Sequence, residues 1–234
     1  MRVTPLVSRA GRWISTRLRL NGGAGLTDIT SEAGCPSPGK HGSWILPAAA
    51  ARCCITFARW ANRAVEGVEI SPEQAQIARQ VTPHIHQQDV LAYLKARQGS
   101  LELITALDLI EHFRKDEVLE FLDLCYQALT TGGRLILQTP NAASPWCSAI
   151  RYGDFTYEVC FTPSLLKSLL QMLGYRNIEA REQGPVPKGN GCKNTVRYYL
   201  WRGFGAAMSL WSLVECGSPG ETVRTRVFIA SAVK

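Results

Sequence analysis

Leu101-Glu-Leu-Ile-Thr-Ala-Leu-Asp108 is an apolar run that ends in an acid, a pattern typical of a buried parallel strand. An amphipathic pattern over 117–129 predicts the helix that follows, and Thr130-Thr-Gly-Gly133 is expected to stop it. The next strand is predicted over 134–139. Strand and helix therefore alternate in this part of the chain, which predicts an α/β fold with a doubly wound parallel sheet.

The same alternation extends outward from this segment. Upstream, 64–70 reads as a short strand, and Ser71-Pro-Glu-Gln74 opens a helix with Ser at the cap and Pro in the first turn. The pattern predicts a weak strand over 84–88 and a short helix over 90–97. Downstream it predicts a helix over 162–173 and two strands, over 176–181 and 225–232.

The N-terminal region has a different composition. Glycine and proline interrupt every period in residues 1–45, which are expected to be irregular, and a helix is predicted over 47–61. We therefore expect a poorly structured basic segment, 1–45, before one domain, 46–234, with an insertion over 184–222. Residues 1–60 hold eight Arg and Lys against two acids, so most of the net charge of +7 lies there. A solvated tail is the expected reading, with no specific nucleic-acid partner.

The eight cysteines are scattered and form no metal-ligand spacing, so no metal site is expected. A reducing compartment, and with it a cytoplasmic location, is the simpler inference.

Three acids end successive predicted strands, at the sheet edge where open α/β folds bind ligands. Glu69 stands where an acid accepts hydrogen bonds from ribose hydroxyls, although it could equally serve the helix that starts after Ser71. Asp89 could receive an adenine amino group while Val90 covers the ring, or it could simply cap its own helix. Asp108 is the third acid.

The joint spacing of four blocks resembles the conserved pattern of class I S-adenosylmethionine (SAM)-dependent methyltransferases. The blocks are Val65-Glu-Gly-Val-Glu-Ile-Ser-Pro-Glu-Gln74, Gln88-Asp-Val90, Leu107-Asp-Leu-Ile-Glu-His112 and Leu129-Thr-Thr-Gly-Gly-Arg-Leu-Ile-Leu-Gln-Thr-Pro-Asn141. The branch of ubiquinone-biosynthesis O-methylases looks closest, and the likeness covers roughly 64–183.

The resemblance implies a Rossmann-like, mostly parallel sheet with an antiparallel last strand, SAM as cofactor and a small-molecule acceptor. It also implies ribose contact for Glu69, adenine contact for Asp89 and Val90, and a cofactor pocket lined by Asp108 and Leu109.

Methyl transfer to oxygen gains from a general base with a pKa near neutral. His112 follows the strand that ends at Asp108 and is the candidate base, against the alternative of a capping or packing histidine. Asp154, Tyr157 and Glu158 lie on the loop expected to cover the substrate, and they are candidates for the acceptor pocket.

One family element is missing from the sequence. The first strand should end in a glycine-rich turn near position 48, yet residues 47–52 are Pro-Ala-Ala-Ala-Ala-Arg and no glycine occurs between Gly42 and Gly67. Cβ atoms there would clash with the cofactor or forbid the turn. The first strand is expected to be lost as well. Two explanations stand: an inactive relative that acts by binding, or a misread frame over residues 1–60. A nicotinamide dehydrogenase is disfavoured because no G-x-G-x-x-G turn precedes Glu69.

The stretch 198–214 has one charge and many aromatic and aliphatic residues. It is marginally short for a membrane span and contains Arg202. A helix packed on the domain, or a lid over the acceptor site, is one interpretation. The other is an interfacial helix in peripheral contact with a membrane or a lipid-like acceptor.

Overall fold

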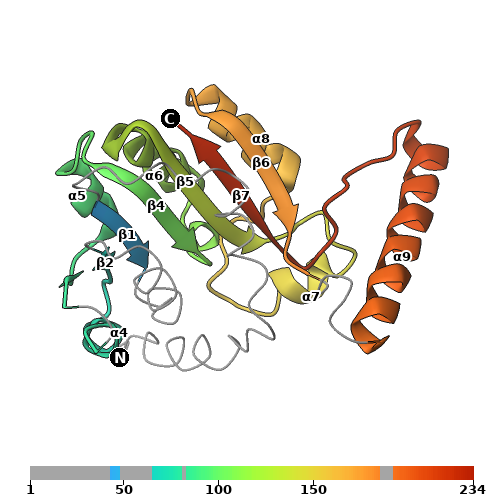
Figure 1. The fold of residues 1–234 in the computed structure, drawn as a ribbon, viewed down its shortest axis with the longest axis horizontal. Helices are drawn as coiled ribbons and strands as arrows, with labels where there is room; N and C mark the ends of the chain where they lie inside the picture. The colour runs from blue at the N-terminus through green and yellow to red at the C-terminus, as the bar shows by residue number, and fades with distance from the viewer. Residues whose placement is uncertain (1–42, 48–64, 81–82, 185–191) are drawn as a thin grey trace, which may run out of the picture.

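The computed structural model describes residues 43–47, 65–80, 83–184 and 192–234. Its seven strands form one sheet in the order β3-β2-β1-β4-β5-β7-β6 (Figure 1). Every pairing is parallel except those of β7, which runs antiparallel to both β5 and β6. The predicted fold class is therefore confirmed. The strands are β1 (Ser43–Pro47), β2 (Val65–Val68), β3 (Ile85–His86), β4 (Leu101–Leu107), β5 (Leu129–Pro140), β6 (Arg176–Glu182) and β7 (Val227–Val233).

The first strand of the sheet is present, so the expectation that it is lost is wrong. β1 lies between β2 and β4, with Trp44 paired to Val65 and Ile45 to Ile104. Pro47 is the last residue of this strand and not the start of a helix. The rest of the helix predicted over 47–61 lies outside the described residues, as does the position of the expected glycine turn.

The helices begin where the capping residues predict. Ser71 Oγ accepts from the Gln74 amide at 3.5 Å, and Thr162 Oγ1 accepts from the Leu165 amide at 3.1 Å. Proline occupies the first turn after both caps. The described helices are α4 (Pro72–Ala78), α5 (Val90–Lys95), the 3₁₀ turn η2 (Ile110–His112), α6 (Lys115–Ala128), α7 (Cys147–Arg151), α8 (Pro163–Met172) and α9 (Cys192–Cys216).

The strand after α6 is longer than predicted. β5 starts at Leu129, so Thr130–Gly133, expected to be a helix stop alone, continue the strand. The pairing of β4 with β5 shifts register at this point, between Leu101 and Leu103. An irregular pairing of this kind has no local sequence signature, because it depends on the neighbouring strand.

Helices pack on the sheet and fix its edge. α6 lies on β5 and fully buries Phe121 and Leu122, while α8 covers β6 and β7 and buries Leu166 and Leu170. The Tyr175 hydroxyl donates to the main-chain oxygen of Leu122 at 3.0 Å, which joins the end of α8 to α6. The carboxyl ends of the parallel strands therefore form a rigid edge at which ligands of this fold class bind.

α9 stands apart from the sheet, beyond β6 and β7 (Figure 1). None of its 25 residues is buried. It touches the domain mainly through Trp201 and Phe204, which lie against Trp146. The Trp201 indole also donates to Glu182 at 2.9 Å. No helix among the described residues has the length and hydrophobicity needed to cross a membrane.

Candidate active site

Glu69 follows β2 at the ligand edge of the sheet. Its amide donates to the His86 carbonyl at 3.0 Å, which holds the end of β2 beside β3. Its carboxylate oxygen Oε1 accepts from the Ser71 amide at 3.0 Å. The contact to the start of α4 anticipated for Glu69 therefore exists, and it occupies one carboxylate oxygen. The second oxygen can accept from the hydroxyls of a bound sugar.

Asp89 follows β3 and caps α5. Its oxygen Oδ2 accepts from the Ala92 amide at 2.9 Å, and its side chain is exposed. Val90 is half-buried and packs against the hydrophobic core. Both sequence readings of Asp89 are thus compatible, because capping leaves its other oxygen directed to solvent at the ligand edge.

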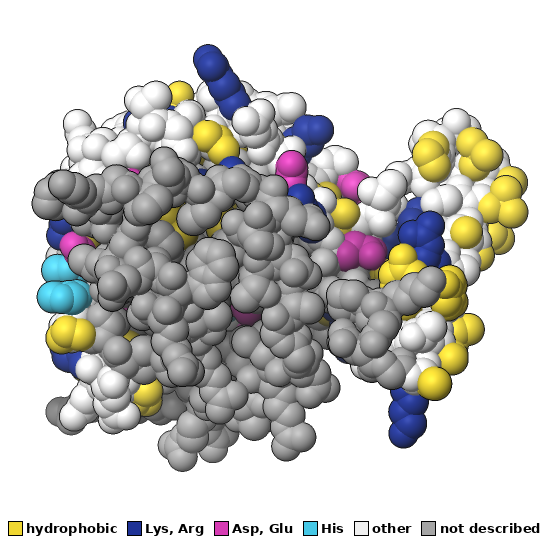
Figure 2. Space-filling model, viewed as in Figure 1, with side chains coloured by type: hydrophobic (Ala, Val, Ile, Leu, Met, Phe, Trp, Pro, Cys, Tyr) yellow, Lys and Arg dark blue, Asp and Glu magenta, His cyan; other side chains and the backbone are white. Residues whose placement is uncertain are grey.

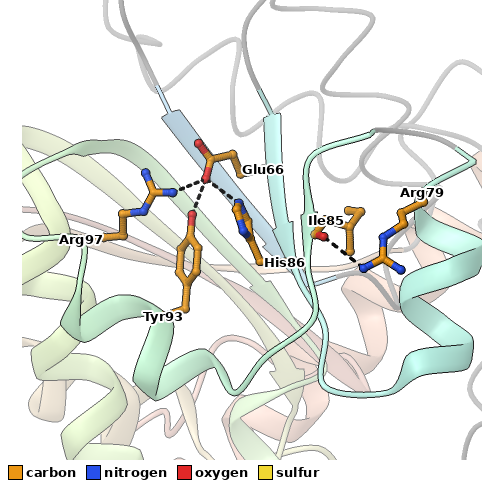
Figure 3. A network of polar contacts seen from close by, with 6 residues as sticks. All are labelled: Glu66, Arg79, Ile85, His86, Tyr93 and Arg97. Atoms are coloured by element: carbon orange, nitrogen blue, oxygen red, sulfur yellow. Dashed lines mark hydrogen bonds and ion pairs between the residues drawn. The ribbon is translucent and has the colours of Figure 1, made fainter.

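A polar network joins β2, β3 and α5 (Figure 3). One carboxylate oxygen of Glu66 accepts from His86 Nε2 at 3.1 Å, from Arg97 at 2.9 Å and from the Tyr93 hydroxyl. Burial alone would raise the pKa of Glu66, but the hydrogen bond from Tyr93 and the charge of Arg97 hold it below its usual value. Burial and the Glu66 carboxylate raise the pKa of Tyr93. The network fixes the ends of the strands that present Glu69 and Asp89.

Asp108 has a backbone conformation that residues other than glycine rarely adopt. Its φ is +50°, a strain of about 1–3 kcal/mol that typically accompanies functional sites. Gln138 Nε2 donates to both carboxylate oxygens, at 3.2 and 3.1 Å, and Gln138 Oε1 accepts from Gln183 at 3.0 Å. Burial raises the pKa of Asp108, and these hydrogen bonds offset only part of that rise. The acid is held firmly at the end of β4.

Glu111 is the most deeply buried acid of this edge, with none of its surface exposed. Thr139 Oγ1 donates to its Oε2 at 3.1 Å, while its Oε1 has no hydrogen-bond partner among the described residues. Burial, with repulsion from Asp108 second, raises the pKa of Glu111 to about 8. Its carbonyl accepts from the amides of Glu158 and Val159, at 2.9 and 3.2 Å. Glu111 thus anchors the candidate acceptor loop.

His112 lies on η2, beside the loop from 154 to 158. Its Nδ1 is 2.9 Å from Thr156 Oγ1 and 3.3 Å from the Thr156 carbonyl. Thr156 Oγ1 in turn donates to Asp154 at 2.7 Å. Burial would raise the pKa of Asp154, but hydrogen bonds from Thr156 and the charge of His112 hold it below its usual value. Asp154, Thr156 and His112 therefore form one chain of contacts.

The structure brings together only some of the predicted acceptor-pocket residues. The Tyr157 ring lies 5.2 Å from that of His112, at 59°. The Glu158 side chain does not join this group. It is exposed, and the contact of Glu158 with Glu111 is made by the main chain. Leu109 is half-buried and packs against the core at the start of η2.

Glu111, Gln138, Thr156 and Gln183 also lie at this edge, and they were not predicted as site residues. Glu111 and Gln138 lie inside motif blocks, where an acid and an amide among apolar neighbours were the available signal. The other two, Thr156 and Gln183, are ordinary loop residues without such a signal.

A family model described as a methyltransferase domain matches residues 38–180, more than half of the chain and all of β1. The chain belongs to this methyltransferase family. No curated protein sequence matches the chain significantly. The family's methyl donor is SAM, which is the cofactor of this protein.

Solved structures of methyltransferases share the fold. A SAM-dependent methyltransferase from Archaeoglobus fulgidus is 15% identical, with a TM-score of 0.63 over 89% of this chain and 92% of that one. Phosphoethanolamine N-methyltransferase 2 from Haemonchus contortus, in complex with SAM, is also 15% identical, with a TM-score of 0.55 over 96% of this chain and 56% of that one. The cyclase SpnF is 16% identical, with a TM-score of 0.56 over 92% of this chain and 84% of that one. At these identities the likeness establishes the fold alone.

The described residues fit the adenosine half of SAM. Glu69 and Asp89 each keep one carboxylate oxygen outside their capping contacts, at the end of adjacent strands. The methionine half would meet the segment after β1, where the sequence has Ala-Ala-Ala-Ala-Arg over 48–52 and no glycine. That segment lies outside the described residues.

Proposed function

We propose that the protein transfers a methyl group from SAM to an oxygen of a small-molecule acceptor, with His112 as the general base. A phenol or catechol hydroxyl is the proposed acceptor, in keeping with the resemblance to O-methylases. The contact chain from Asp154 through Thr156 to His112 is the observation that supports this most directly.

The hydrogen bonds of Thr156 define which ring nitrogen of His112 can accept a proton. A threonine hydroxyl has one hydrogen, and Thr156 donates it to Asp154. Thr156 Oγ1 and the Thr156 carbonyl can therefore only accept from His112 Nδ1, which must hold a hydrogen. In the neutral ring the lone pair is then on Nε2, which has no hydrogen-bond partner among the described residues. That is the state a general base requires.

Each side of the edge has a separate task in this proposal. When bound, SAM supplies a methyl group already activated by the sulfonium, so placement of the acceptor provides most of the rate enhancement. Glu69 and Asp89 would bind the ribose and the adenine. Asp108, fixed by Gln138, would line the pocket, and Tyr157 would pack against the acceptor beside His112. We place this activity in the cytoplasm, supported by the scattered cysteines.

The test is a series of phenols with graded hydroxyl pKa, with S-adenosylhomocysteine formation as the readout. His112→Asn should lower kcat about 100-fold for phenols that are protonated at the assay pH, since a general base contributes about that much. The loss should shrink for phenols that are already ionised. His84→Asn, at the exposed residue just before β3, is the matched control and should behave as wild type. An equal loss for every phenol would refute the role of His112.

An inactive relative that acts by binding is the second candidate, and the glycine-free sequence Ala-Ala-Ala-Ala-Arg that follows β1 favours it. Calorimetry with S-adenosylhomocysteine separates the two. Absence of binding at millimolar ligand would exclude the methyltransferase function for this chain.

A further inference from the structure

α9 has two unlike faces. The face toward the domain is half-buried: Trp201 and Phe204 lie against the Trp146 ring, with centroids 6.2 and 5.7 Å apart. Further along this face, Arg224 donates to Ser209 Oγ at 2.9 Å. These contacts fix the orientation of α9, so its opposite face is turned outward by the fold.

The outward face carries large apolar side chains in two groups, 196–200 and 210–214, each side chain between 50 and 82% exposed. At 100° per residue both groups fall on one stripe, and the small residues Gly203 and Ala207 lie on this stripe between them. Figure 2 shows these hydrophobic side chains gathered on the outer side of α9. The members of the stripe are Val196, Tyr199, Leu200, Leu210, Trp211, Leu213 and Val214.

Basic residues flank this stripe. At 100° per residue, Arg202 lies along one margin, while Lys193 and Arg197 lie along the other. All three side chains are exposed. Glu215, in the last turn, is the single acid of α9, and it accepts from the Trp211 indole at 3.2 Å. The helix therefore offers an apolar stripe between margins of positive charge.

We propose that the outward face of α9 binds the surface of an anionic lipid bilayer, with the helix lying parallel to the membrane plane. An apolar stripe rich in aromatic and aliphatic residues enters the boundary between headgroups and acyl chains, and flanking cations meet anionic headgroups. The exposed large apolar side chains of α9 lie on one face, and the opposite face packs on the domain, so the helix would lie on the bilayer surface.

The charges on α9 match an anionic lipid surface. The helix carries three exposed cations, Lys193, Arg197 and Arg202, against a single acid, Glu215. Anionic headgroups would neutralise the cations on both margins of the stripe. This charge complementarity is the reason for proposing a lipid surface as its occupant.

Membrane binding through α9 would also orient the rest of the protein. Trp146, against which α9 packs, follows Asn141 at the end of β5 and precedes the loop that contacts His112. A bilayer bound by α9 would therefore be linked, through the contact with Trp146, to the segment that leads into this loop. The binding itself does not depend on methyl transfer, so its test is independent of the proposed function.

Co-sedimentation of the full chain with vesicles tests the proposal. Vesicles of phosphatidylcholine alone are compared with vesicles that contain about 30% phosphatidylglycerol. The second kind has a negatively charged surface of the type that basic segments bind. We expect the protein to bind the anionic vesicles. Leu200→Ser/Val214→Ser should reduce this binding about tenfold, because each change removes methyl groups that would enter the bilayer. Ile77→Ser/Met172→Ser changes two other exposed apolar residues, on α4 and α8, and this matched control should bind as wild type.

The charge requirement is tested separately. The triple change Lys193→Ala, Arg197→Ala, Arg202→Ala should abolish the preference for anionic vesicles, while Lys115→Ala, Lys167→Ala, Arg176→Ala should retain it. Circular dichroism of each variant verifies that it folds. Equal sedimentation with both vesicle types, or no sedimentation, would overturn the proposal. So would a stable dimer that Leu200→Ser/Val214→Ser dissociates, because the stripe would then be a contact between copies.

Discussion

The two halves of the ligand edge are built in opposite ways. After β2 and β3, Glu69 and Asp89 are accessible and make short-range contacts to the helices that follow them. After β4, in the enclosed half, Asp108 is half-buried and Glu111 is fully buried, and they contact residues about 30 positions away, Gln138 and Thr139. Accessible acids with an unused oxygen suit ligand binding, whereas the fully buried Glu111 holds neighbouring elements in place.

The largest expected effect tests the enclosed half, through the titration of Glu111. Its pKa in the folded protein, about 8, exceeds the ordinary value of 4.5, so the folded state retains a proton that the unfolded state has lost. The stabilisation is therefore complete below about pH 4.5 and is lost as pH rises toward 8. Linkage at about 1.4 kcal/mol per unit gives a loss of roughly 3–5 kcal/mol.

Urea unfolding between pH 5 and 8.5 measures this loss. Glu111→Gln removes the titration but keeps an oxygen to accept from Thr139, so its free energy of unfolding should fall less with pH than that of wild type. Glu117→Gln, which removes a carboxylate from the first turn of α6, is the control. Parallel pH profiles for wild type and Glu111→Gln would show that Glu111 is ionised in the folded protein.

The next effect tests whether the accessible half depends on the polar network around Glu66. Glu66→Ala should lower the free energy of unfolding by about 2 kcal/mol, because Arg97 and Tyr93 lose a charged acceptor. It should also weaken S-adenosylhomocysteine binding, since β2 and β3 lose their common anchor. Glu73→Ala, on α4, is the control. A loss of stability with unchanged affinity would show that the network stabilises the fold but does not support ligand binding.

A smaller effect is expected from the accessible acid itself. Glu69→Ala should raise the Kd for S-adenosylhomocysteine at least tenfold, because a hydrogen bond to a charged group contributes about 1.5–3 kcal/mol. Stability should change by less than about 1 kcal/mol, since the side chain makes one capping contact. Calorimetry and urea unfolding give the two values. A large loss of stability with unchanged Kd would make Glu69 a structural cap.

Sequence reasoning located the accessible half well because its contacts are local. The caps of α4 and α5 follow from residues two or three positions apart, and parallel strands place their ends at one edge. β1 was missed because Pro47 suits both the end of a strand and the first turn of a helix. Pairing with β2 and β4 determines the outcome, and that pairing is not encoded within 43–47.

The enclosed half was predicted less well, since burial is a property of the packed fold. Glu111 follows Ile110 in a short 3₁₀ turn, and nothing in the sequence indicates that it is fully buried. Thr156 contacts His112 across 44 positions. His112 and Asp154 were named as candidates, but the threonine that joins them could be found only in three dimensions.

The smallest expected effect concerns that threonine. Thr156→Val keeps the shape of the side chain but removes the hydroxyl between Asp154 and His112. The Thr156 carbonyl still accepts from Nδ1, at the longer distance of 3.3 Å, so the ring keeps part of its orientation. We therefore expect kcat to fall only about fivefold, the equivalent of about 1 kcal/mol, because one hydrogen bond is lost. Thr156→Ser, which retains the hydroxyl, should restore activity, and the acid limb of the pH profile should shift in the valine variant alone. Equal activity of both variants would show that Asp154 does not influence His112 through this hydroxyl.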